Sequence, residues 1–225
     1  MSLLDGLRGG LIVSVQAWRG SALDDARVIA AMARAAQDGG AVAVRVAGVE
    51  HLRAVRERVA LPIVGLIKRE YPGFEPYITP TRADARAVID AGAEIVAFDA
   101  TARRRPGDET LADLIDSIHS GGRLALADCA TAADAAAALT NGADAVATTL
   151  CGYTPQTKGH PLPALDLVRE LAPLAGFKVC EGGIRSPSEV RAALDAGADA
   201  VVVGTAITNV DWLVREFAGS ADRVS

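Results

Sequence analysis

Several residue types and motifs are scarce in this chain, and each scarcity narrows the range of functions. Only three histidines occur among 225 residues, and they lie far apart without the spacing typical of metal ligands. The sequence has no GxSxG motif, which marks one class of serine nucleophile. The segment after the first apolar run, VQAWRGS, lacks the glycine-rich fingerprint of dinucleotide-binding proteins. These absences argue against a metal centre, a serine hydrolase site and a Rossmann cofactor site.

Cysteine, basic charge and long apolar runs are also in short supply. The three cysteines form no CxxC motif and no evident disulfide framework, which fits a reducing cytoplasm. No apolar run approaches the roughly 18 residues needed to span a bilayer, and the first residues do not resemble a signal peptide. The formal net charge of −5 argues against nucleic acid, which selects basic patches. We expect a cytoplasmic protein that binds neither membrane nor nucleic acid.

Apolar residues, in contrast, make up half of the chain and recur in a regular pattern. No linker rich in proline, serine or glycine divides the sequence, so we expect one domain over residues 1–225. Four similar segments recur about every 50 residues, each after an alanine-rich helical stretch: GGAVAVRV, GAEIVAFD, GADAVATT and GADAVVVG. The glycine suits the end of a helix and the apolar run suits a buried strand.

Four further apolar runs lie between these repeats: LIVSVQ, LPIVGLIK, RLALADC and FKVCEGG. Helical stretches follow them too, and Ser186 to Glu189 form a capping-box pattern at the start of one. Strict alternation of strands and helices indicates a parallel sheet. Eight such units predict an α/β fold, a small (β/α)8 TIM barrel, and an open doubly wound sheet is the competing architecture.

Polar residues stand at the expected carboxyl ends of the strands, where barrels of this type carry their active sites. A single polar residue there is more often a solvated rim residue or a helix cap, and Asp99 is expected to be a cap. Four odd-numbered strands that all end in hydrogen-bonding side chains instead indicate a site. These strand-end residues are Gln16, Lys68, Asp128 and Glu181, and the even strands end near Arg45, Asp99, Thr148 and Gly204.

Glycines follow the last two expected strands, in the segments EGG at Glu181 and VGTA at Val203. Barrels often bind phosphate at these two loops, through backbone N–H groups and the start of a short helix. We therefore expect a phosphate-binding site there. Trp18 follows the first strand and is expected near the mouth, whereas Trp212 in the last helix is expected in the core.

These segments resemble the bacterial N-acetylmannosamine-6-phosphate 2-epimerases nearly from end to end. The resemblance is carried by LIVSVQ, GLIKRE, YITPT, FDATARRRP, LADC, TTLCGYT, CEGG and VGTAIT. It implies a (β/α)8 fold and an isomerase of amino sugar and sialic acid catabolism that inverts C2 of N-acetylmannosamine 6-phosphate. It also implies that no metal ion or organic cofactor is needed. The implied partner is a small-molecule amino sugar phosphate, and a homodimer is left open.

The same resemblance assigns roles to individual residues. Lys68 and Glu181 would be the acid/base pair, with Lys68 at C2 and Glu181 serving ring opening and proton return. The sugar would be held by Gln16, Arg45 and Asp128, a loop over the site would contribute Tyr153 and Thr154, and phosphate would be bound around Gly182, Gly183, Gly204 and Thr205.

The chain departs from the family pattern at a few positions. Val15 stands where the family commonly has cysteine, and Gly183 where it often has a polar residue. Asn209 stands where the family usually has arginine. Two alternatives remain open at this point: a Schiff-base aldolase of the same fold with Lys68 as nucleophile, and a phosphosugar-binding protein without activity.

Overall fold

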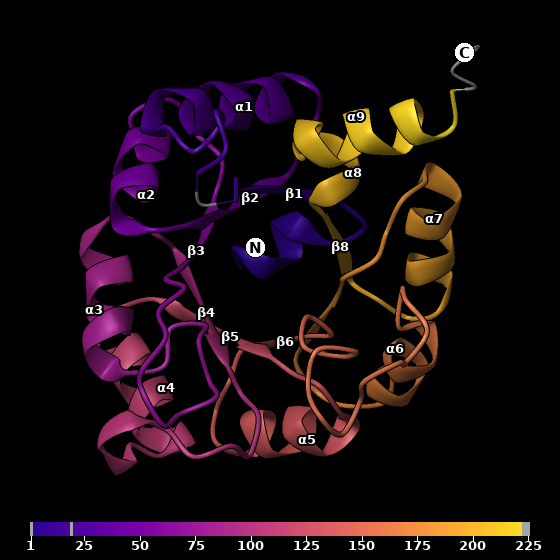
Figure 1. Ribbon diagram of the computed structural model, residues 1–225. Helices are drawn as coiled ribbons and strands as arrows, with labels where there is room; N and C mark the ends of the chain where they lie inside the picture. The colour runs from indigo at the N-terminus through magenta and orange to yellow at the C-terminus, as the bar shows by residue number, and fades with distance from the viewer. Residues whose placement is uncertain (1, 19, 222–225) are drawn as a thin grey trace.

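A computed structural model describes residues 2–18 and 20–221 of the chain. Its centre is a closed barrel of eight parallel strands in the order in which they occur in the sequence, as Figure 1 shows from one end. The strands are β1 (Leu11–Val15), β2 (Ala43–Ala47), β3 (Ile63–Leu66), β4 (Ile95–Asp99), β5 (Leu124–Asp128), β6 (Ala145–Ala147), β7 (Phe177–Glu181) and β8 (Ala200–Val203). The predicted (β/α)8 TIM barrel is therefore confirmed.

Helices form a ring around the barrel (Figure 1). They are α1 (Ala26–Asp38), α2 (Val49–Arg56), α3 (Arg82–Asp90), α4 (Leu111–Ser120), α5 (Ala132–Thr140), α6 (Leu165–Leu171), α7 (Pro187–Asp195), α8 (Thr205–Thr208) and α9 (Val210–Gly219). Two short 3₁₀ helices, η1 (Leu4–Leu7) and η2 (Pro106–Asp108), complete the described part. No helix within that part is both long and apolar enough to cross a bilayer.

Side-chain caps fix where several of the ring helices begin. Thr110, Thr131 and Ser186 each accept a hydrogen bond from the backbone N–H three residues later, and the acidic side chain at that position bonds back to the cap. Such reciprocal capping boxes satisfy backbone donors that the first helical turn leaves without partners. The box predicted at Ser186 to Glu189 is confirmed.

Apolar side chains fill the barrel and the layer between barrel and helices. The interior cluster includes Ile12, Val64, Leu126 and Phe177, and η1 places Leu7 against it at the amino end of the strands. Fully burying one such side chain contributes roughly 1.5–3 kcal/mol relative to leaving it exposed. The amino end is thus closed by packed hydrophobic groups.

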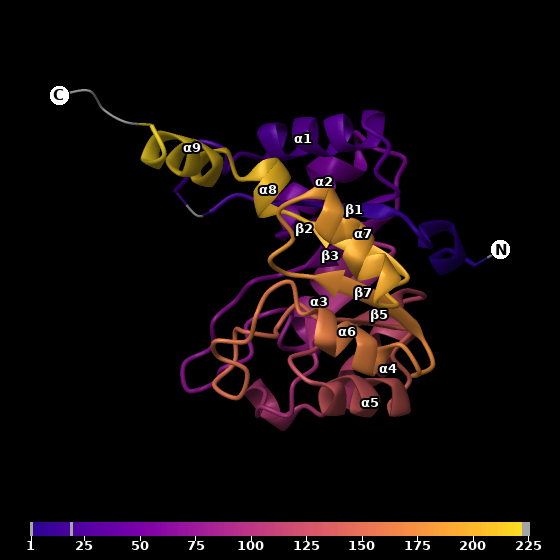
Figure 2. The same ribbon diagram turned by 90° about the vertical axis from the view of Figure 1, so that its right-hand side faces the viewer.

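The carboxyl end of the barrel faces the opposite way. In Figure 2, η1 and the N-terminus lie at one end, while α8, α9 and the long β3–α3 and β6–α6 connections lie at the other. Helix α9 has no buried residue, and Trp212 on it is only partly buried, with the Arg185 guanidinium 5.5 Å from its ring centroid. The expectation that Trp212 belongs to the core is wrong, because α9 lies outside the packed ring.

Candidate active site

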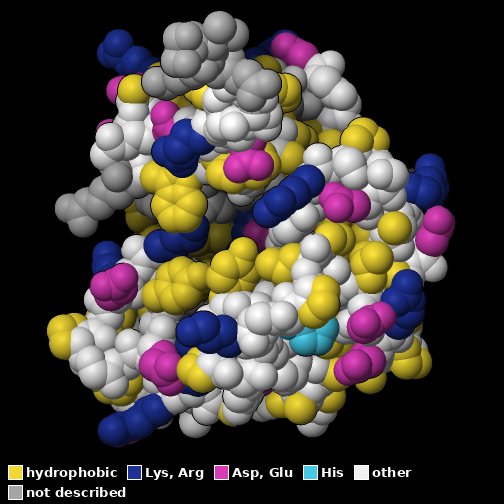
Figure 3. All heavy atoms as spheres, turned by 45° about the vertical axis from the view of Figure 1, so that its right-hand side comes forward, with side chains coloured by type: hydrophobic (Ala, Val, Ile, Leu, Met, Phe, Trp, Pro, Cys, Tyr) yellow, Lys and Arg dark blue, Asp and Glu magenta, His cyan; other side chains and the backbone are white. Residues whose placement is uncertain are grey.

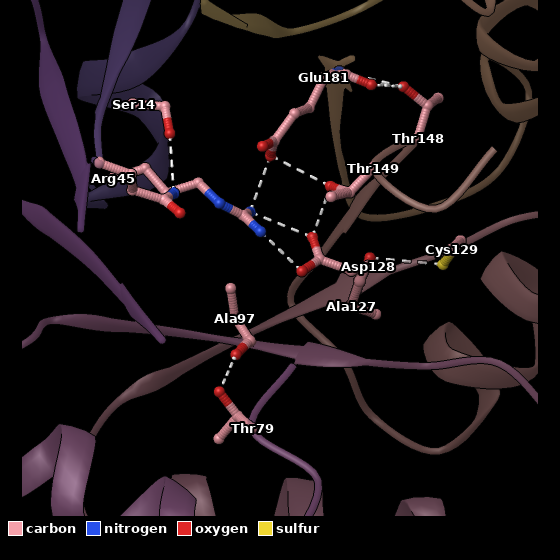
Figure 4. Close-up of polar contacts among 11 residues, drawn as sticks. Ser14, Arg45, Thr79, Ala97, Ala127, Asp128, Cys129, Thr148, Thr149 and Glu181 are labelled. Atoms are coloured by element: carbon pink, nitrogen blue, oxygen red, sulfur yellow. Dashed lines mark hydrogen bonds and ion pairs between the residues drawn. The ribbon is translucent and has the colours of Figure 1, made fainter. Parts of the chain in front are cut away.

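Three charged side chains from three strands form an ion cluster just inside the carboxyl end of the barrel. Arg45 of β2 donates from both terminal nitrogens to Asp128 at the end of β5, with N–O distances of 3.1 and 2.7 Å. The Nη1 atom of Arg45 also lies 2.8 Å from Oε2 of Glu181, the last residue of β7. Figure 4 shows the three side chains converging from separate strands. The guanidinium thus bridges the two carboxyl groups and fixes their orientation.

Burial makes this cluster electrostatically strong. The side chains of Arg45 and Asp128 are 1% and 0% exposed, and that of Glu181 is 14% exposed. Burial disfavours the charged guanidinium, but Asp128 and Glu181 more than offset this effect and raise the pKa of Arg45. Arg45 is therefore a permanent positive charge at the floor of the site.

Two consecutive threonines after β6 hold Glu181 in place (Figure 4). Thr148 binds its backbone: the Thr148 hydroxyl donates to the Glu181 carbonyl over 2.9 Å and accepts from the Glu181 N–H over 3.0 Å. Thr149 contacts the side chain, with its Oγ1 at 3.0 Å from Glu181 Oε2 and 2.6 Å from Asp128 Oδ1. The glutamate is thereby fixed at both its backbone and its carboxyl group.

The environment of Glu181 favours its protonated form. Burial is the main cause and raises its pKa above the ordinary value of 4.5, although Arg45 acts in the opposite direction. The negative charge of Asp128 raises the pKa further, whereas a hydrogen bond donated by Thr149 and the charge of Lys68 act in the opposite direction. A carboxyl group with a raised pKa can act as a proton donor near neutral pH.

Lys68 lies at the rim, two residues beyond the end of β3, and its side chain is still accessible to water. The surrounding atoms partly desolvate the ammonium, and this effect together with Arg45 lowers its pKa; Glu181 and Asp128 oppose the shift. A lowered pKa increases the fraction of neutral amine, which is the form that can accept a proton. A lysine with a lowered pKa and a glutamic acid with a raised pKa therefore lie at one barrel mouth.

The β3–α3 connection, which follows Lys68, carries an open cavity. A cavity of about 420 Å³ there is lined by Tyr77 and by five residues of the segment before it, Glu70, Tyr71, Pro72, Phe74 and Glu75. Burial and the carboxylates Asp128 and Asp99 raise the pKa of Tyr77, so its hydroxyl stays protonated at neutral pH. Figure 3 shows a hollow across this face with hydrophobic and basic side chains along it.

The other predicted sugar- and loop-binding residues lie around this mouth at different depths. Gln16 follows β1 and donates from Nε2 to Ser14 Oγ over 2.8 Å. Tyr153 is 61% exposed in the β6–α6 connection. Thr154 is buried there, and its hydroxyl bonds to that of Thr157 over 2.8 Å, which stabilises the loop itself.

The predicted phosphate residues come from two neighbouring loops after β7 and β8. Gly182 and Gly183 have φ values of 108° and 74°, a backbone region that favours glycine. A Cβ on Gly183 would also collide with Leu162 of the β6–α6 connection, so glycine is required here where the family often has a polar residue. Gly204 is the N-cap of α8, and Thr205 is its exposed first residue.

Asn209 and Asp99 have structural partners. The Asn209 side chain accepts from the backbone N–H of Trp212 over 2.9 Å and so caps α9. Asp99, at the end of β4, accepts from the N–H and hydroxyl of Thr101 and pairs with Arg103 at 2.7 Å. The expectation that Asp99 caps the following turn is confirmed.

All three cysteines are buried, and burial raises the pKa of Cys180 to about 11, so it is a neutral thiol at pH 7.

The sequence alone did not predict roles for Thr149 or Tyr77, although they lie within the segments TTLCGYT and YITPT, respectively. The sequence feature that could have indicated Thr149 is its position directly after Thr148, the polar residue expected at the end of a strand.

A barrel mouth that carries a lysine of lowered pKa and a glutamic acid of raised pKa is typical of an enzyme that moves protons on a small molecule. The sequence profile described as "Putative N-acetylmannosamine-6-phosphate epimerase" matches residues 29–223. The chain belongs to this family of carbohydrate epimerases, and the resemblance noted in the sequence is confirmed.

Individual relatives agree over nearly their whole length. The chain is 49% identical to a "Putative N-acetylmannosamine-6-phosphate 2-epimerase" of Thermosynechococcus vestitus, covering 96% of this chain and 95% of that protein. It is 42% identical to a protein of the same name from Clostridium perfringens, covering 96% and 98%. A solved structure of the Clostridium perfringens epimerase has a TM-score of 0.95, with 40% identity and coverage of 98% and 97%.

Proposed function

We propose that this chain converts N-acetylmannosamine 6-phosphate into N-acetylglucosamine 6-phosphate by removing and returning the proton at C2. One observation carries the proposal beyond family membership: Lys68 and Glu181 have pKa values shifted in opposite directions at the same mouth. Such opposite shifts bring the pKa of the base and the pKa of the acid closer to neutral pH, which favours proton transfer.

The chemistry proceeds through the open-chain sugar. In the ring form the C2–H bond is barely acidic, whereas in the open chain it is α to an aldehyde and its loss gives a delocalised enolate. Protonated Glu181 gives its proton to the ring oxygen as the C1–O bond of the ring breaks, and its carboxylate takes the proton of the C1 hydroxyl, which leaves the open-chain aldehyde. The neutral amine of Lys68 then takes the C2 proton, Glu181 returns its proton to the opposite face of C2, and proton exchange with water restores both groups. The resulting Lys68 ammonium and the fixed charge of Arg45 stabilise the enolate oxygen electrostatically.

Substrate binding divides between the two sides of the mouth. Gln16 contacts the sugar directly, and Arg45 and Asp128 act from the floor of the site, where they fix the position and charge of Glu181. Backbone N–H groups of Gly182, Gly183, Gly204 and Thr205 bind the 6-phosphate, supported by the positive φ values of the two glycines after β7. Tyr153 and Thr154 belong to the loop that covers the sugar.

Turnover in heavy water followed by proton NMR tests the reaction. The product should carry deuterium at C2, because the proton on Lys68 or Glu181 exchanges with solvent. Absence of turnover would contradict the proposal, and complete retention of the original hydrogen would favour an internal proton return. Borohydride treatment in the presence of substrate should leave the protein unmodified, since a trapped lysine adduct would indicate the aldolase alternative.

The assembly that fits this chain best is a homodimer in the cytoplasm, with a second copy covering α9. Val210, Val214 and Phe217 lie at helical spacing on α9 and are 47%, 59% and 76% exposed. The helix has no buried residue and extends beyond the barrel in Figure 2. Such an apolar stripe on a helix normally faces a packing partner.

Sedimentation velocity tests the dimer. The wild-type chain should sediment as a dimer, and Phe217→Glu should shift it toward the monomer because a charge would then be buried in the interface. Glu216→Ala, on the neighbouring exposed position, is the control and should leave the dimer intact. A monomeric wild-type chain would rule out this assembly.

A further inference from the structure

The hydroxyl of Thr149 stands between two carboxyl groups, which is an unusual position for a single donor. Its Oγ1 is 2.6 Å from Asp128 Oδ1 and 3.0 Å from Glu181 Oε2 (Figure 4). A threonine hydroxyl has one proton and two lone pairs, whereas an ionised carboxylate can only accept. If both carboxyl groups were ionised, one of these two contacts would bring lone pairs together without a proton between them.

The distances indicate where the threonine proton lies. The contact with Asp128 is the shorter and falls within the range of charge-assisted O–H···O⁻ bonds. Asp128 is fully buried and is held by both terminal nitrogens of Arg45, so it is the natural carboxylate of the pair. The remaining contact, from Thr149 Oγ1 to Glu181 Oε2, is then a hydrogen bond only if that oxygen carries a proton and donates it to Thr149, while its lone pair accepts from Arg45 Nη1 over 2.8 Å.

We propose that Thr149 is a positioning residue that keeps Glu181 protonated and aims its proton before the chemical step. This inference rests on the proposed function, since it concerns the acid of that reaction. In the protonated state Thr149 makes two hydrogen bonds, one donated to Asp128 and one accepted from Glu181. After Glu181 has released its proton, the hydroxyl can satisfy only one of the two carboxylates, so the network favours recovery of the proton.

The opposite arrangement is a distinct alternative with the opposite sign. A Thr149 hydroxyl that donates to Glu181 lowers the pKa of that group, because it stabilises the carboxylate. A hydroxyl that accepts from Glu181 stabilises the acid and raises the pKa. Removing the hydroxyl therefore shifts the titration of Glu181 to lower pH under our proposal and to higher pH under the alternative.

Thr149→Val removes the hydroxyl with nearly constant shape, and Thr149→Ser keeps it. In substrate-free protein, the infrared C=O band of the protonated carboxyl that disappears in Glu181→Gln reports the titration directly. We expect the midpoint to fall by about one pH unit in Thr149→Val, the scale of one ordinary hydrogen bond, and to stay near wild type in Thr149→Ser. An unchanged or raised midpoint in Thr149→Val would overturn the proposal.

Kinetics give a second readout. With the phosphosugar at neutral pH, kcat should fall about tenfold in Thr149→Val while KM changes less than twofold, and Thr149→Ser should recover most of kcat. If Thr149→Val does not fold, Thr149→Ala serves for both measurements. A wild-type chain without turnover would contradict the proposed function, whereas the infrared titration would still decide the position of the Thr149 proton.

Thr148→Val is the matched control, because Thr148 binds only the backbone of Glu181. It should lower the melting temperature through two lost hydrogen bonds and leave the infrared midpoint close to wild type. A shift in Thr148→Val as large as that in Thr149→Val would mean that general loosening moves the titration, which also overturns the proposal.

Discussion

The two ends of the barrel are built from the same eight strands but have opposite chemistry. At the carboxyl end, Arg45, Asp128 and Glu181 are buried together within hydrogen-bonding distance. At the amino end, Leu7 and Phe177 are 2% and 3% exposed in an apolar cluster closed by η1. The same parallel strands therefore begin in a packed apolar cluster and end at a charged site.

This difference predicts that residues at the carboxyl end mainly affect turnover, whereas residues at the amino end mainly affect the stability of the fold. Taking an ion out of water costs several kcal/mol even after relaxation, and pairing repays this cost only where the geometry is good and the remaining polar atoms are hydrogen-bonded. The mouth is thus the end at which burial and neighbouring charges shift the pKa values of Lys68 and Glu181. The apolar end provides burial without such a cost, so changes at the two ends should affect different measurements.

Removing the acid or the base at the mouth should give the largest effect on turnover. Lys68→Met and Glu181→Gln should each reduce kcat by about 10²-fold or more, the usual scale for a positioned acid or base. The melting temperature of Lys68→Met should change little, because the Lys68 side chain is exposed at the rim. Near-normal kcat in either variant, measured in a coupled assay, would remove that residue from its proposed role.

Truncation at the amino end should produce the converse result. Leu7→Ala deletes a buried side chain between η1 and the barrel, which typically costs about 2–5 kcal/mol of unfolding free energy. Urea denaturation measures this loss, and kcat per folded molecule should stay at the wild-type value. Leu4→Ala, a partly buried neighbour, is the matched control and should cost less. A lower kcat for folded Leu7→Ala would show that the amino end also affects turnover.

The sequence could predict the barrel because its strand and helix units repeat. It could also predict that Lys68 and Glu181 lie at the same rim, because the carboxyl ends of parallel strands meet there. It could not predict that Arg45 and Asp128 form a two-point pair, since this depends on side chains 83 positions apart. The expectation that Trp212 lies in the core was wrong, because an amphipathic pattern shows that a helix needs a packing partner but does not show which surface provides it.

The free energy of unfolding should depend on pH, because the pKa of Glu181 differs between the folded and unfolded states. The folded-state pKa of Glu181 lies above its ordinary value of 4.5, so the native state binds an extra proton between these two values. Its contribution to stability is complete below pH 4.5 and is lost as the pH rises through the folded-state pKa. Within that window the free energy of unfolding should fall by up to about 1.4 kcal/mol per pH unit relative to Glu181→Gln.

Denaturant unfolding of wild type and Glu181→Gln at several pH values measures this difference. Other titrating groups cancel to first order, because the two chains differ at one position. A difference that rises with pH in this window would show a lowered folded-state pKa, and the raised value could not stand.

The smallest effect is expected at Asn209, where the mouth adjoins α9. Its side chain caps this helix by accepting from the Trp212 N–H, and loss of such a cap costs about 1 kcal/mol. Asn209→Ala should therefore lower the melting temperature slightly and leave KM for the phosphosugar unchanged. Asn209→Arg loses the same cap but adds a charged fork beside the proposed phosphate loops, so its KM should fall about tenfold. KM for the unphosphorylated sugar should not change in either variant. Equal KM values in the two variants would show that residue 209 acts only as the N-cap of α9.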